Sequence, residues 1–327
     1  MILVRAPLRI TLGGGGTDLP VWYKKNKSFL IYLAINKYIY VSINKRNYDN
    51  KIWLSYSKIE VVNKINEIKN EYIKVCFKRF KNLEGIEFHS IAEIPSSSGL
   101  GSSGSFLVAN NFILNDFKNI IMSKNSLAEL SCKQEMINLG KSTGKQDQYA
   151  ATFGGFQKMK IDKKGKVSLQ KIHIKQSNFD ILKKNILLYY TNIFRSSDSV
   201  LKRQTRNIKK NKNTLAYMNE IQNLGHLSYD ALVNEDYDEF GRILNAHYNF
   251  KRKISSLMSN NILDKIYEYS IESGAIGGKI IGAGGGGVFM FYVPLRNQKK
   301  FRNKIVKTGM REISWDIDNY GVKKIFG

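Results

Sequence analysis

The chain has 327 residues, of which 43% are hydrophobic and 24% are charged, and it contains only four prolines. This composition excludes a disordered chain, and the length is sufficient for two domains with separate cores. No stretch reaches the roughly 18 to 20 uninterrupted apolar residues of a membrane helix, because Asn36 and Lys37 interrupt the longest candidate, residues 29–43. The sequence therefore predicts a folded protein with no membrane as partner.

The net charge of +25 is the unusual feature of the composition. A basic excess of this size is compatible with nucleic acid, a membrane surface or an anionic small substrate as the partner. The lysines are scattered as short pairs among many Asn and Ile residues, as at Lys163-Lys164 and Lys299-Lys300. We interpret this scatter as a general amino-acid bias and expect no nucleic-acid partner, while a concentrated binding surface is the alternative.

The first residues and the two cysteines indicate where the protein is located. Residues 1–7 contain no basic region followed by an apolar run, so we expect no secretory signal. Cys76 and Cys132 lie far apart, without C-x-x-C or Cys/His spacing, which favours reduced structural thiols over a zinc site. A cytoplasmic location is the resulting expectation.

The first 140 residues predict strands followed by helices. Short apolar or alternating segments rich in Ile, Val and Tyr predict strands at residues 2–6, 10–12, 31–35, 38–44 and 87–91. Helical periodicity follows at residues 103–115 and 126–139. The second of these helices opens with Ser126-Leu-Ala-Glu129, the pattern of a capping box, in which serine and glutamate satisfy free backbone amides.

The remaining residues predict a hairpin, long helices and a glycine-rich turn into a strand. The predicted elements are strands at 156–161 and 166–174 joined by a turn at Lys163-Lys164-Gly165, a buried strand at 185–191, helices at 200–233 and 239–256, and a glycine run at 277–287 before a strand at 288–293. No repeat or linker marks a boundary. We place it near residue 177, between a nucleotide-binding domain of residues 1–177 and a closing domain of residues 178–327.

The segment Pro95-Ser-Ser-Ser-Gly-Leu-Gly-Ser-Ser-Gly-Ser105 carries the strongest motif of the chain. It lies between a predicted strand and an apolar helix, so its backbone amides would point outward at a helix N-terminus, where phosphate binds readily. Its glycines let the backbone approach an anion, and Ser102 and Ser103 can donate hydroxyls to phosphate or bind Mg²⁺. The motif predicts a nucleotide phosphate site, and a flexible connection is the alternative.

Two glycine patterns, at residues 99–104 and 282–287, formally match the dinucleotide fingerprint G-x-G-x-x-G. That fingerprint also needs a strand ending in an acidic residue about 20 positions later, and Asp116 falls too early. Gly140-Lys141-Ser142 lacks the upstream glycine of a Walker loop, and the H-R-D and D-F-G motifs of protein kinases are missing. A dinucleotide-dependent oxidoreductase is therefore a remote alternative.

Three further segments point to a small-ligand site. A strand that starts near Arg5 breaks into four glycines followed by Thr17-Asp18, a backbone that brings a ligand against main-chain amides. Gly144-Lys-Gln-Asp147-Gln-Tyr follows a predicted helix and places a carboxylate at a turn. The run at residues 282–287 would close over the same pocket or let elements pack tightly.

On these motifs the sequence resembles the GHMP small-molecule kinases, which include galactokinase and the homoserine, mevalonate and phosphomevalonate kinases. The match rests on Arg5-Ala-Pro-Leu-Arg9 and residues 95–103 and 279–287, in the order of the family, and it spans nearly the whole chain. The resemblance implies an α+β fold of two domains, an N-terminal ribosomal-protein-S5-like α/β domain and a C-terminal ferredoxin-like α+β domain. It also implies ATP and Mg²⁺ as cofactors.

Within the family, the segments around Thr17-Asp18 and Asp147 are similar to the branch that phosphorylates the anomeric hydroxyl of sugars. This resemblance implies phosphorylation of a sugar phosphate at C1, with D-glycero-D-manno-heptose 7-phosphate as the expected substrate and the 1,7-bisphosphate, a precursor of nucleotide-activated heptose for surface polysaccharide, as the product. A fucose or galactose 1-kinase is the alternative within the family. A nucleic-acid-binding protein is a remote alternative that only the charge supports. The oligomeric state stays open, with a homodimer as a candidate.

The resemblance also implies roles for single residues. Asp147 would orient or deprotonate the sugar hydroxyl, and Arg9 would stabilise that carboxylate and the developing phosphoryl charge. Glu135 and Ser103 would hold Mg²⁺. The residues expected to bind ATP are Pro95, Ser96, Ser97, Ser98, Gly99, Leu100, Gly101, Ser102 and Ser103. The residues expected to bind the sugar are Gly15, Gly16, Thr17, Asp18, Arg195, Gly284 and Gly285.

Three of these roles have plainer alternatives. Asp147 could be a turn residue at the C-terminus of a helix, and Glu135 could be a solvated helix glutamate. Arg195 resembles the arginine of a Thr-Gly-x-x-Arg segment in heptose kinases, although Asn192 stands where that segment has glycine. Its guanidinium would bind the phosphate already on the substrate, or it would be a surface charge.

Overall fold

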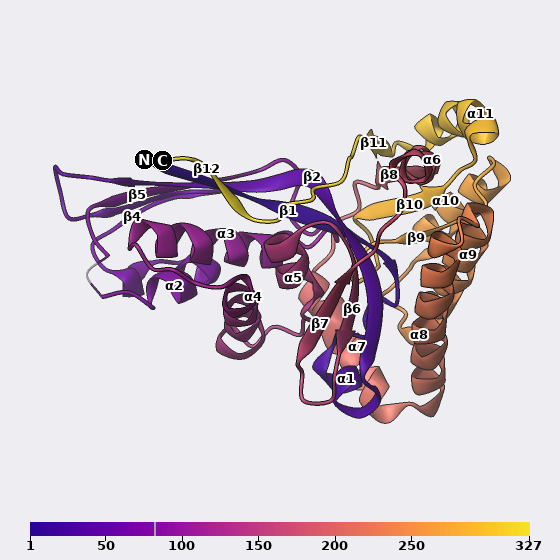
Figure 1. Ribbon diagram of the computed structural model, residues 1–327, viewed down its shortest axis with the longest axis horizontal. Helices are drawn as coiled ribbons and strands as arrows, with labels where there is room; N and C mark the ends of the chain where they lie inside the picture. The colour runs from indigo at the N-terminus through magenta and orange to yellow at the C-terminus, as the bar shows by residue number, and fades with distance from the viewer. Residues whose placement is uncertain (82) are drawn as a thin grey trace.

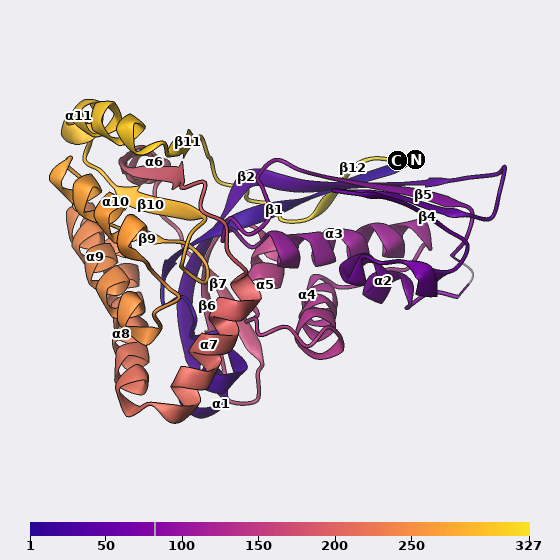
Figure 2. The same cartoon turned by 180° about the vertical axis from the view of Figure 1, so that it is seen from behind.

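The computed structural model describes residues 1–81 and 83–327, which form two β-sheets with their helices (Figure 1). The larger sheet is built mainly from the N-terminal half of the chain, and the smaller sheet comes from the C-terminal half. The view from behind also places them at opposite ends of the molecule (Figure 2). The predicted α+β fold in two domains is confirmed.

Two long antiparallel strands, β1 (Ile2–Gly13) and β2 (Ser28–Lys45), organise the larger sheet. The sequence predicts two short strands in each place, whereas the structure has one continuous strand. The apparent breaks coincide with irregularities of the ladder. Pro7 lies beside a register shift of β1, and Asn36 and Lys37 lie where β2 exchanges one neighbour, β6, for another, β5.

The larger sheet has the order β12-β1-β2-β5-β3-β4, and β6 and β7 continue it from the first part of β2. These shorter strands are β3 (Ile52–Ser55), β4 (Ile59–Val62), β5 (Ile86–Ala92), β6 (Phe156–Ile161), β7 (Val167–Lys171) and β12 (Lys323–Phe326). The predictions of β5, β6 and β7 are confirmed, while β3 and β4 are too short to show a periodic pattern. β12 pairs with β1 and brings the chain termini together (Figures 1 and 2).

Helices cover one face of the larger sheet, with α3 (Ser102–Phe117) at the centre, which confirms the helix predicted at residues 103–115 (Figure 1). The other helices of this half are α1 (Pro20–Asn26), η1 (Ile65–Glu67), α2 (Glu71–Phe77), α4 (Lys124–Lys133), η2 (Gln134–Asn138) and α5 (Gln146–Phe153). α2, α4 and α5 all pack against α3, so the start of α3 is held rigidly between helices and sheet.

The predicted capping box at Ser126 and Glu129 is wrong. α4 is capped by Ser123, whose Oγ accepts a hydrogen bond from the backbone N–H of Ser126 at 3.1 Å. The Glu129 carboxylate instead accepts hydrogen bonds from Nζ of Lys145 at 2.7 and 2.8 Å, since a cation is a stronger partner than a backbone amide. The helix predicted to reach residue 139 changes into the π-helical turn η2, which carries Glu135.

The smaller sheet has the order β11-β8-β10-β9. Its strands are β8 (Ile186–Tyr190), β9 (Gly277–Ile280), β10 (Val288–Tyr292) and β11 (Arg311–Ile313). β8 and β10 are buried along their whole length, as the apolar runs at residues 185–191 and 288–293 predict. The first part of the glycine run forms β9, and residues 281–287 connect β9 to its neighbour β10 at the edge that faces the other half of the molecule.

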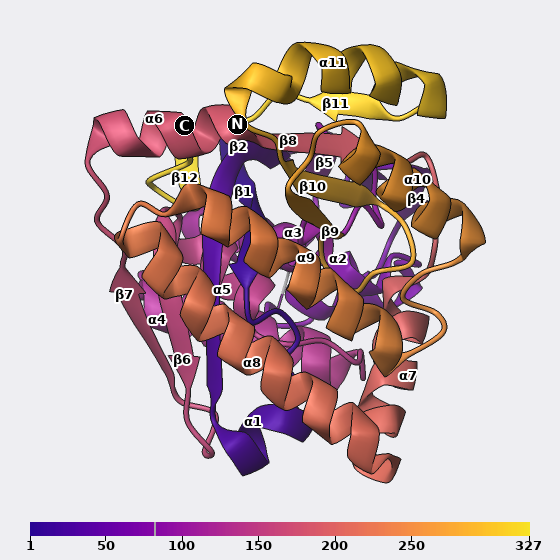
Figure 3. The same cartoon turned by 90° about the vertical axis from the view of Figure 1, so that its right-hand side faces the viewer.

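Helices surround the smaller sheet, and α8 and α9 cross one face of the molecule (Figure 3). The helices of this half are α6 (Gln176–Asn185), α7 (Ser197–Lys210), α8 (Lys212–Val233), α9 (Tyr237–Ile254), α10 (Asn261–Glu272), α11 (Leu295–Ile305) and η3 (Val306–Thr308). The helix predicted at residues 200–233 is two helices, because Asn211 ends α7 and caps α8 by accepting hydrogen bonds from the N–H groups of Asn213 and Thr214. The helix predicted at residues 239–256 is confirmed.

The division proposed at residue 177 falls in α6, near its start, and it stays a prediction. None of the helices within residues 1–81 and 83–327 is long and apolar enough to cross a membrane.

Candidate active site

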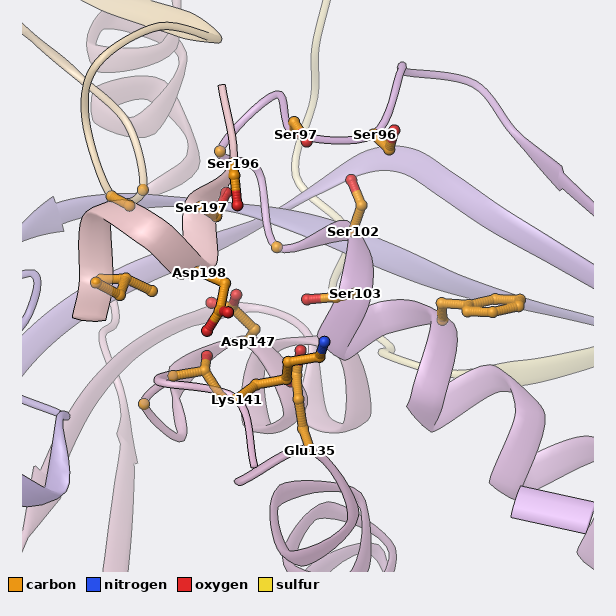
Figure 4. A pocket seen from close by; sticks show the side chains of 18 of the residues that line it. Ser96, Ser97, Ser102, Ser103, Glu135, Lys141, Asp147, Ser196, Ser197 and Asp198 are labelled. Atoms are coloured by element: carbon orange, nitrogen blue, oxygen red, sulfur yellow. The ribbon is translucent and has the colours of Figure 1, made fainter. Parts of the chain in front are cut away.

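A cavity of about 840 Å³ lies where the glycine-rich loop before α3, the loop before α5 and the start of α7 meet (Figure 4). Its walls also include Gly15, Gly16, Asp18 and Leu19 after β1 and residues 282–283 after β9. All four segments that carry motifs in the sequence therefore contribute to one cavity. A cavity of this size, closed in by segments distant in the chain, can hold a nucleotide and a small substrate together.

Close contacts that exclude side chains shape the glycine-rich loop. Gly99 and Gly101 have φ values of 84° and 86°, a conformation that glycine adopts at little cost. A Cβ atom on Gly99 would lie 2.3 Å from the carbonyl oxygen of Ile281, and one on Gly101 would lie 3.2 Å from Cγ of Asp147. Such packing excludes the alternative of a flexible connection.

The loop leads into the N-terminus of α3, where Ser102 and Ser103 line the cavity (Figure 4). The Oγ of Ser102 is buried and has no hydrogen-bond partner among residues 1–81 and 83–327. An unpaired buried hydroxyl is unfavourable, so a ligand oxygen is its natural partner. Together with the positive end of the helix dipole, this hydroxyl gives the start of α3 the donors that an anion requires.

Arg9 and Asp147 form a partly buried ion pair in the cavity. Arg9 is 3% exposed, and its Nε and Nη2 donate hydrogen bonds to Oδ1 of Asp147 at 2.9 and 2.6 Å. The third guanidinium nitrogen, Nη1, donates to the carbonyl oxygen of Gly99 at 2.5 Å. Asp147 lies in the first turn of α5, so it is not a turn residue at the C-terminus of a helix. Arg9 therefore connects the carboxylate to the glycine-rich loop.

Asp18 is a second buried carboxylate in the cavity, 1% exposed. It accepts hydrogen bonds from the backbone N–H and from Nε2 of Gln146, at 3.1 and 3.3 Å. The amide of Gln146 is oriented by Thr11, whose Oγ1 donates to Oε1 at 2.7 Å. Burial raises the pKa of Asp18 to about 6, because desolvation outweighs the backbone hydrogen bond from Gln146.

Glu135 approaches the cavity from η2 and is 2% exposed, which excludes a solvated helix glutamate. Nε2 of Gln148 donates a hydrogen bond to its Oε2, and the hydroxyl of Tyr72 donates to Oε1 at 3.3 Å. Burial raises the pKa of Glu135 to about 7, although a hydrogen bond from Ser103 opposes this shift. Carboxylate and serine hydroxyl are thus neighbours in the cavity.

These donors fit a magnesium ion that also binds phosphate. Within the part of the chain that the structure describes, no group of three or more His, Cys, Asp and Glu side chains could hold a metal by itself. Mg²⁺ commonly takes one or two carboxylates and completes its shell with water and phosphate oxygens. Glu135 and Ser103, next to the unpaired hydroxyl of Ser102, offer that kind of incomplete donor set.

Two cations face the cavity from the C-terminal half, Arg195 after β8 and Lys251 on α9. Nη1 of Arg195 donates to Oγ of Ser197 at 2.9 Å, whereas Nε and Nη2 are buried without a partner in the described ranges. Lys251 is 7% exposed, and its Nζ donates to the carbonyl oxygen of Gly282. Burial lowers the pKa of Arg195 to about 10 and the pKa of Lys251 to about 7. Arg195 is therefore not a simple surface charge.

The sequence analysis did not identify Lys251 or Gln146. Lys251 lies four residues after His247 and seven after Leu244, both buried, so the helical period could have shown that its side chain is on the inner face of α9. Gln146 lies beside Asp147 within a motif that drew attention to the carboxylate alone. For Lys251, its position on the apolar face of a predicted helix was the indication that the sequence offered.

The cavity brings together most of the residues predicted to bind ligands. Those that line it are Arg9, Gly15, Gly16, Asp18, Ser96, Ser97, Gly99, Gly101, Ser102, Ser103, Glu135, Asp147 and Arg195. The described cavity wall does not include Thr17, Pro95, Ser98, Leu100, Gly284 or Gly285. Thr17 instead supports its own loop, since its hydroxyl donates to the carbonyl oxygens of Gly14 and Phe29 at 2.8 and 3.0 Å.

The comparison with known proteins identifies the family. Residues 66–155 match the model of the GHMP kinases N terminal domain, and residues 228–310 match GHMP kinases C terminal. The chain is 30% identical over 304 residues to the D-glycero-alpha-D-manno-heptose 7-phosphate kinase of Campylobacter jejuni, with 89% of each chain covered. The chain belongs to the GHMP kinases. Their phosphate donor is ATP.

This GHMP kinase shares its fold with solved structures over nearly its whole length. A D-glycero-D-manno-heptose 1-phosphate kinase from Bacteroides thetaiotaomicron superposes with a TM-score of 0.83 at 22% identity, covering 100% of both chains. The Lactococcus lactis galactokinase complexed with galactose superposes with a TM-score of 0.76 at 20% identity, covering 99% of this chain and 94% of that one. The predicted family and the predicted class of enzyme, a sugar kinase, are confirmed.

Proposed function

We propose that this GHMP kinase transfers the γ-phosphoryl group of ATP to the anomeric C1 hydroxyl of a sugar phosphate, with D-glycero-D-manno-heptose 7-phosphate as the substrate. The observation that carries the proposal is one cavity lined by two groups that suit phosphate, one dipolar and one cationic. One is the start of α3, and the other contains Arg195, with the Arg9–Asp147 pair also lining the cavity. The relative from Campylobacter jejuni, named as a heptose 7-phosphate kinase, supports the choice of sugar.

The glycine-rich loop and α3 are proposed to bind the phosphates of ATP. The backbone amides at the helix start and the unpaired Oγ of Ser102 would donate to phosphate oxygens. Glu135 and Ser103 would hold Mg²⁺, which when bound neutralises charge on the phosphates. The protein's own contribution is to hold the donor at a fixed position, because α3 is packed between α2, α5 and the sheet.

Asp147 is proposed to position the attacking hydroxyl. Its Oδ1 is held by Arg9, and among the described residues no hydrogen bond reaches Oδ2, which is free to accept the proton of the C1 hydroxyl. The sugar oxygen then forms a bond to the γ-phosphorus, the bond between that phosphorus and the ADP oxygen breaks, and the hydroxyl proton passes to Asp147. Arg9 would hold the carboxylate in position and stabilise charge on the transferred group.

Asp18 and Arg195 are proposed to recognise the sugar. Asp18 lines the cavity near the loop of Gly15 and Gly16 and can accept hydrogen bonds from sugar hydroxyls. Arg195 would bind the phosphate already on the substrate through its free Nε and Nη2, a geometry that suits two phosphate oxygens. Arg195→Ala should therefore weaken binding of the phosphorylated sugar far more than of an unphosphorylated one. An equal loss for both would remove this role.

The position of transfer is tested by product analysis. Incubation of heptose 7-phosphate with ATP and Mg²⁺, followed by phosphorus NMR, should show a new phosphate whose phosphorus couples to the anomeric proton. A product phosphorylated at any other carbon would contradict the proposal. A homodimer and a cytoplasmic location stay predictions of the sequence.

A further inference from the structure

We propose that Lys251 and Arg195 together bind the anionic group of the sugar substrate, so that Lys251 contributes to the preference for a phosphorylated over an unphosphorylated sugar. This inference rests on the proposed function, which assigns a phosphate-binding role to Arg195 alone. Lys251 lies in the last turn of α9 and belongs to no motif of the sequence.

Lys251 carries a buried cation without a matching carboxylate. Its side chain is 7% exposed, yet it lines the cavity. Among the ion pairs of residues 1–81 and 83–327, none involves Lys251 or Arg195. The charge of Asp18 raises the pKa of Lys251, but it is the smallest of the causes that act on this pKa. A buried charge without a partner is unfavourable, which is why such groups commonly serve a ligand of opposite charge.

Lys251 and Arg195 repel one another in the protein without ligand. After burial itself, the nearby charge of Arg195 is the largest cause that lowers the pKa of Lys251, followed by the charge of Arg9. The remaining basic groups next to Lys251 are His247 on its own helix and Lys279 on β9, and burial lowers the pKa of both. An anion between Lys251 and Arg195 would turn this repulsion into attraction for both cations.

The glycine-rich turn between β9 and β10, residues 281–287, contacts both side chains. Nζ of Lys251 donates to the carbonyl oxygens of Gly282 and, at 3.4 Å, of Ile280. Further along the same turn, a Cβ on Gly285 would lie only 3.0 Å from Cδ of Arg195, so glycine at that position makes room for the guanidinium. Two carbonyls use part of the donor capacity of an ammonium group, which has three N–H bonds, and a third bond is available for a ligand.

The anion could be supplied by the sugar or by the γ-phosphate of ATP, and the location favours the sugar. The acidic side chain whose charge acts on the pKa of Lys251 is Asp18, the proposed sugar ligand. Glu135, the proposed metal ligand, is not among the causes. Lys251 also comes from α9, in the half of the chain that does not provide the start of α3. We therefore assign the Lys251 and Arg195 pair to the phosphate of the sugar.

The experiment compares kcat/KM for heptose 7-phosphate with kcat/KM for the same heptose without phosphate, in wild type and in Lys251→Met. Methionine keeps the length of the side chain and removes the charge, so the fold should survive. We expect kcat/KM for the phosphorylated sugar to fall about 10- to 100-fold, the size expected for one charge-assisted hydrogen bond, with a change of less than about threefold for the unphosphorylated sugar and for KM of ATP. The matched control is Lys253→Met, an exposed lysine on the same helix, which should leave both values unchanged.

A purely structural role for Lys251, which would hold Gly282 in place, predicts equal losses for both sugars in Lys251→Met, and that result overturns the inference. The double variant Arg195→Met/Lys251→Met gives a second criterion. If both side chains bind one phosphate, the fold loss of kcat/KM for the phosphorylated sugar in the double variant differs from the product of the two single losses. Independent effects would give that product. A larger effect on KM of ATP than on the sugar would assign Lys251 to the nucleotide and also overturn the inference.

If wild type does not phosphorylate heptose 7-phosphate, the proposed function fails, and the inference is then decided by direct binding. Inorganic phosphate is titrated by calorimetry into wild type and Lys251→Met, each saturated with Mg²⁺ and AMPPNP so that the γ-phosphate position is filled. Binding to wild type that is weakened at least about tenfold in the variant supports the two-cation site. Equal binding, or no binding to wild type, contradicts it.

Discussion

Arg9 holds Asp147 by one oxygen only. Both Nε and Nη2 of the arginine donate to Oδ1 of the carboxylate, at 2.9 and 2.6 Å, and Nη1 donates to Gly99 of the glycine-rich loop. The second oxygen, Oδ2, is left for a substrate hydroxyl. One guanidinium thus fixes the proposed proton acceptor relative to the loop proposed to bind ATP, which is the alignment that in-line transfer requires.

Asp147→Asn should abolish turnover, with kcat lower by at least about 100-fold, because the amide keeps the shape of the side chain but cannot accept the proton. Binding of ATP, measured by calorimetry, should change little. The control is Asp116→Asn, at the far end of α3 and ion-paired with Lys324, which should keep full activity. Near-normal turnover of Asp147→Asn would exclude the role of proton acceptor.

Gly101→Ala should slow the enzyme without unfolding it. The added Cβ would lie 3.2 Å from Cγ of Asp147 and 3.4 Å from Cγ of Arg9, so it would displace the ion pair. Gly140→Ala is a matched control, because Gly140 also has a positive φ, 62°, but a Cβ there meets no described atom within 4 Å. Both variants should lose about 1 kcal/mol to backbone strain, while kcat should fall at least about tenfold in Gly101→Ala alone.

Glu135→Gln should raise the Mg²⁺ concentration needed for half-maximal activity by at least about tenfold, since an amide replaces the carboxylate proposed to hold the ion. The measurement is a Mg²⁺ titration at saturating ATP and sugar. Glu268→Gln, an exposed position on α10, is the control and should give the wild-type curve. An unchanged Mg²⁺ requirement in Glu135→Gln would leave its carboxylate without a metal-binding role.

Asp18 should make the protein less stable at high pH. Its pKa is about 6 in the folded protein against 3.8 for an ordinary aspartate, so the folded state binds more protons between these values and stability falls as pH rises through them. The penalty is complete above about pH 6 and is at most about 3 kcal/mol. The melting temperature of Asp18→Asn relative to wild type should therefore be more favourable at pH 8 than at pH 5. An equal difference at both pH values would contradict the raised pKa.

The sequence is most informative about the site where a motif has a strict local geometry. The glycine-rich loop could be predicted because a Gly/Ser segment between a strand and an apolar helix has few other uses, and Arg9 and Asp147 because the resemblance to the family points to them. Glu135 lines the cavity, and its metal-binding role stays a prediction. The helix that carries it ends in a π-helical turn that no propensity indicates.

The residues that were missed owe their positions to long-range packing. Lys251 lines the cavity only because α9 packs against β9 and the glycine-rich turn follows that strand. The capping box failed because Ser123 was available one turn earlier and because Lys145, distant in the sequence, competes for Glu129. The continuous β1 was divided in the prediction at a register shift beside Pro7, and β2 was divided where it changes neighbours, because both irregularities resemble a break in the local pattern.

The substrate panel tests the central claim most directly. It measures kcat/KM of the wild-type protein, with ATP and Mg²⁺, for D-glycero-D-manno-heptose 7-phosphate, the same heptose without phosphate, galactose, fucose and mannose. We predict that heptose 7-phosphate exceeds every unphosphorylated sugar by at least about tenfold, because only it can engage the buried cations of the cavity. A value for galactose or fucose equal to or above that for heptose 7-phosphate would contradict the account.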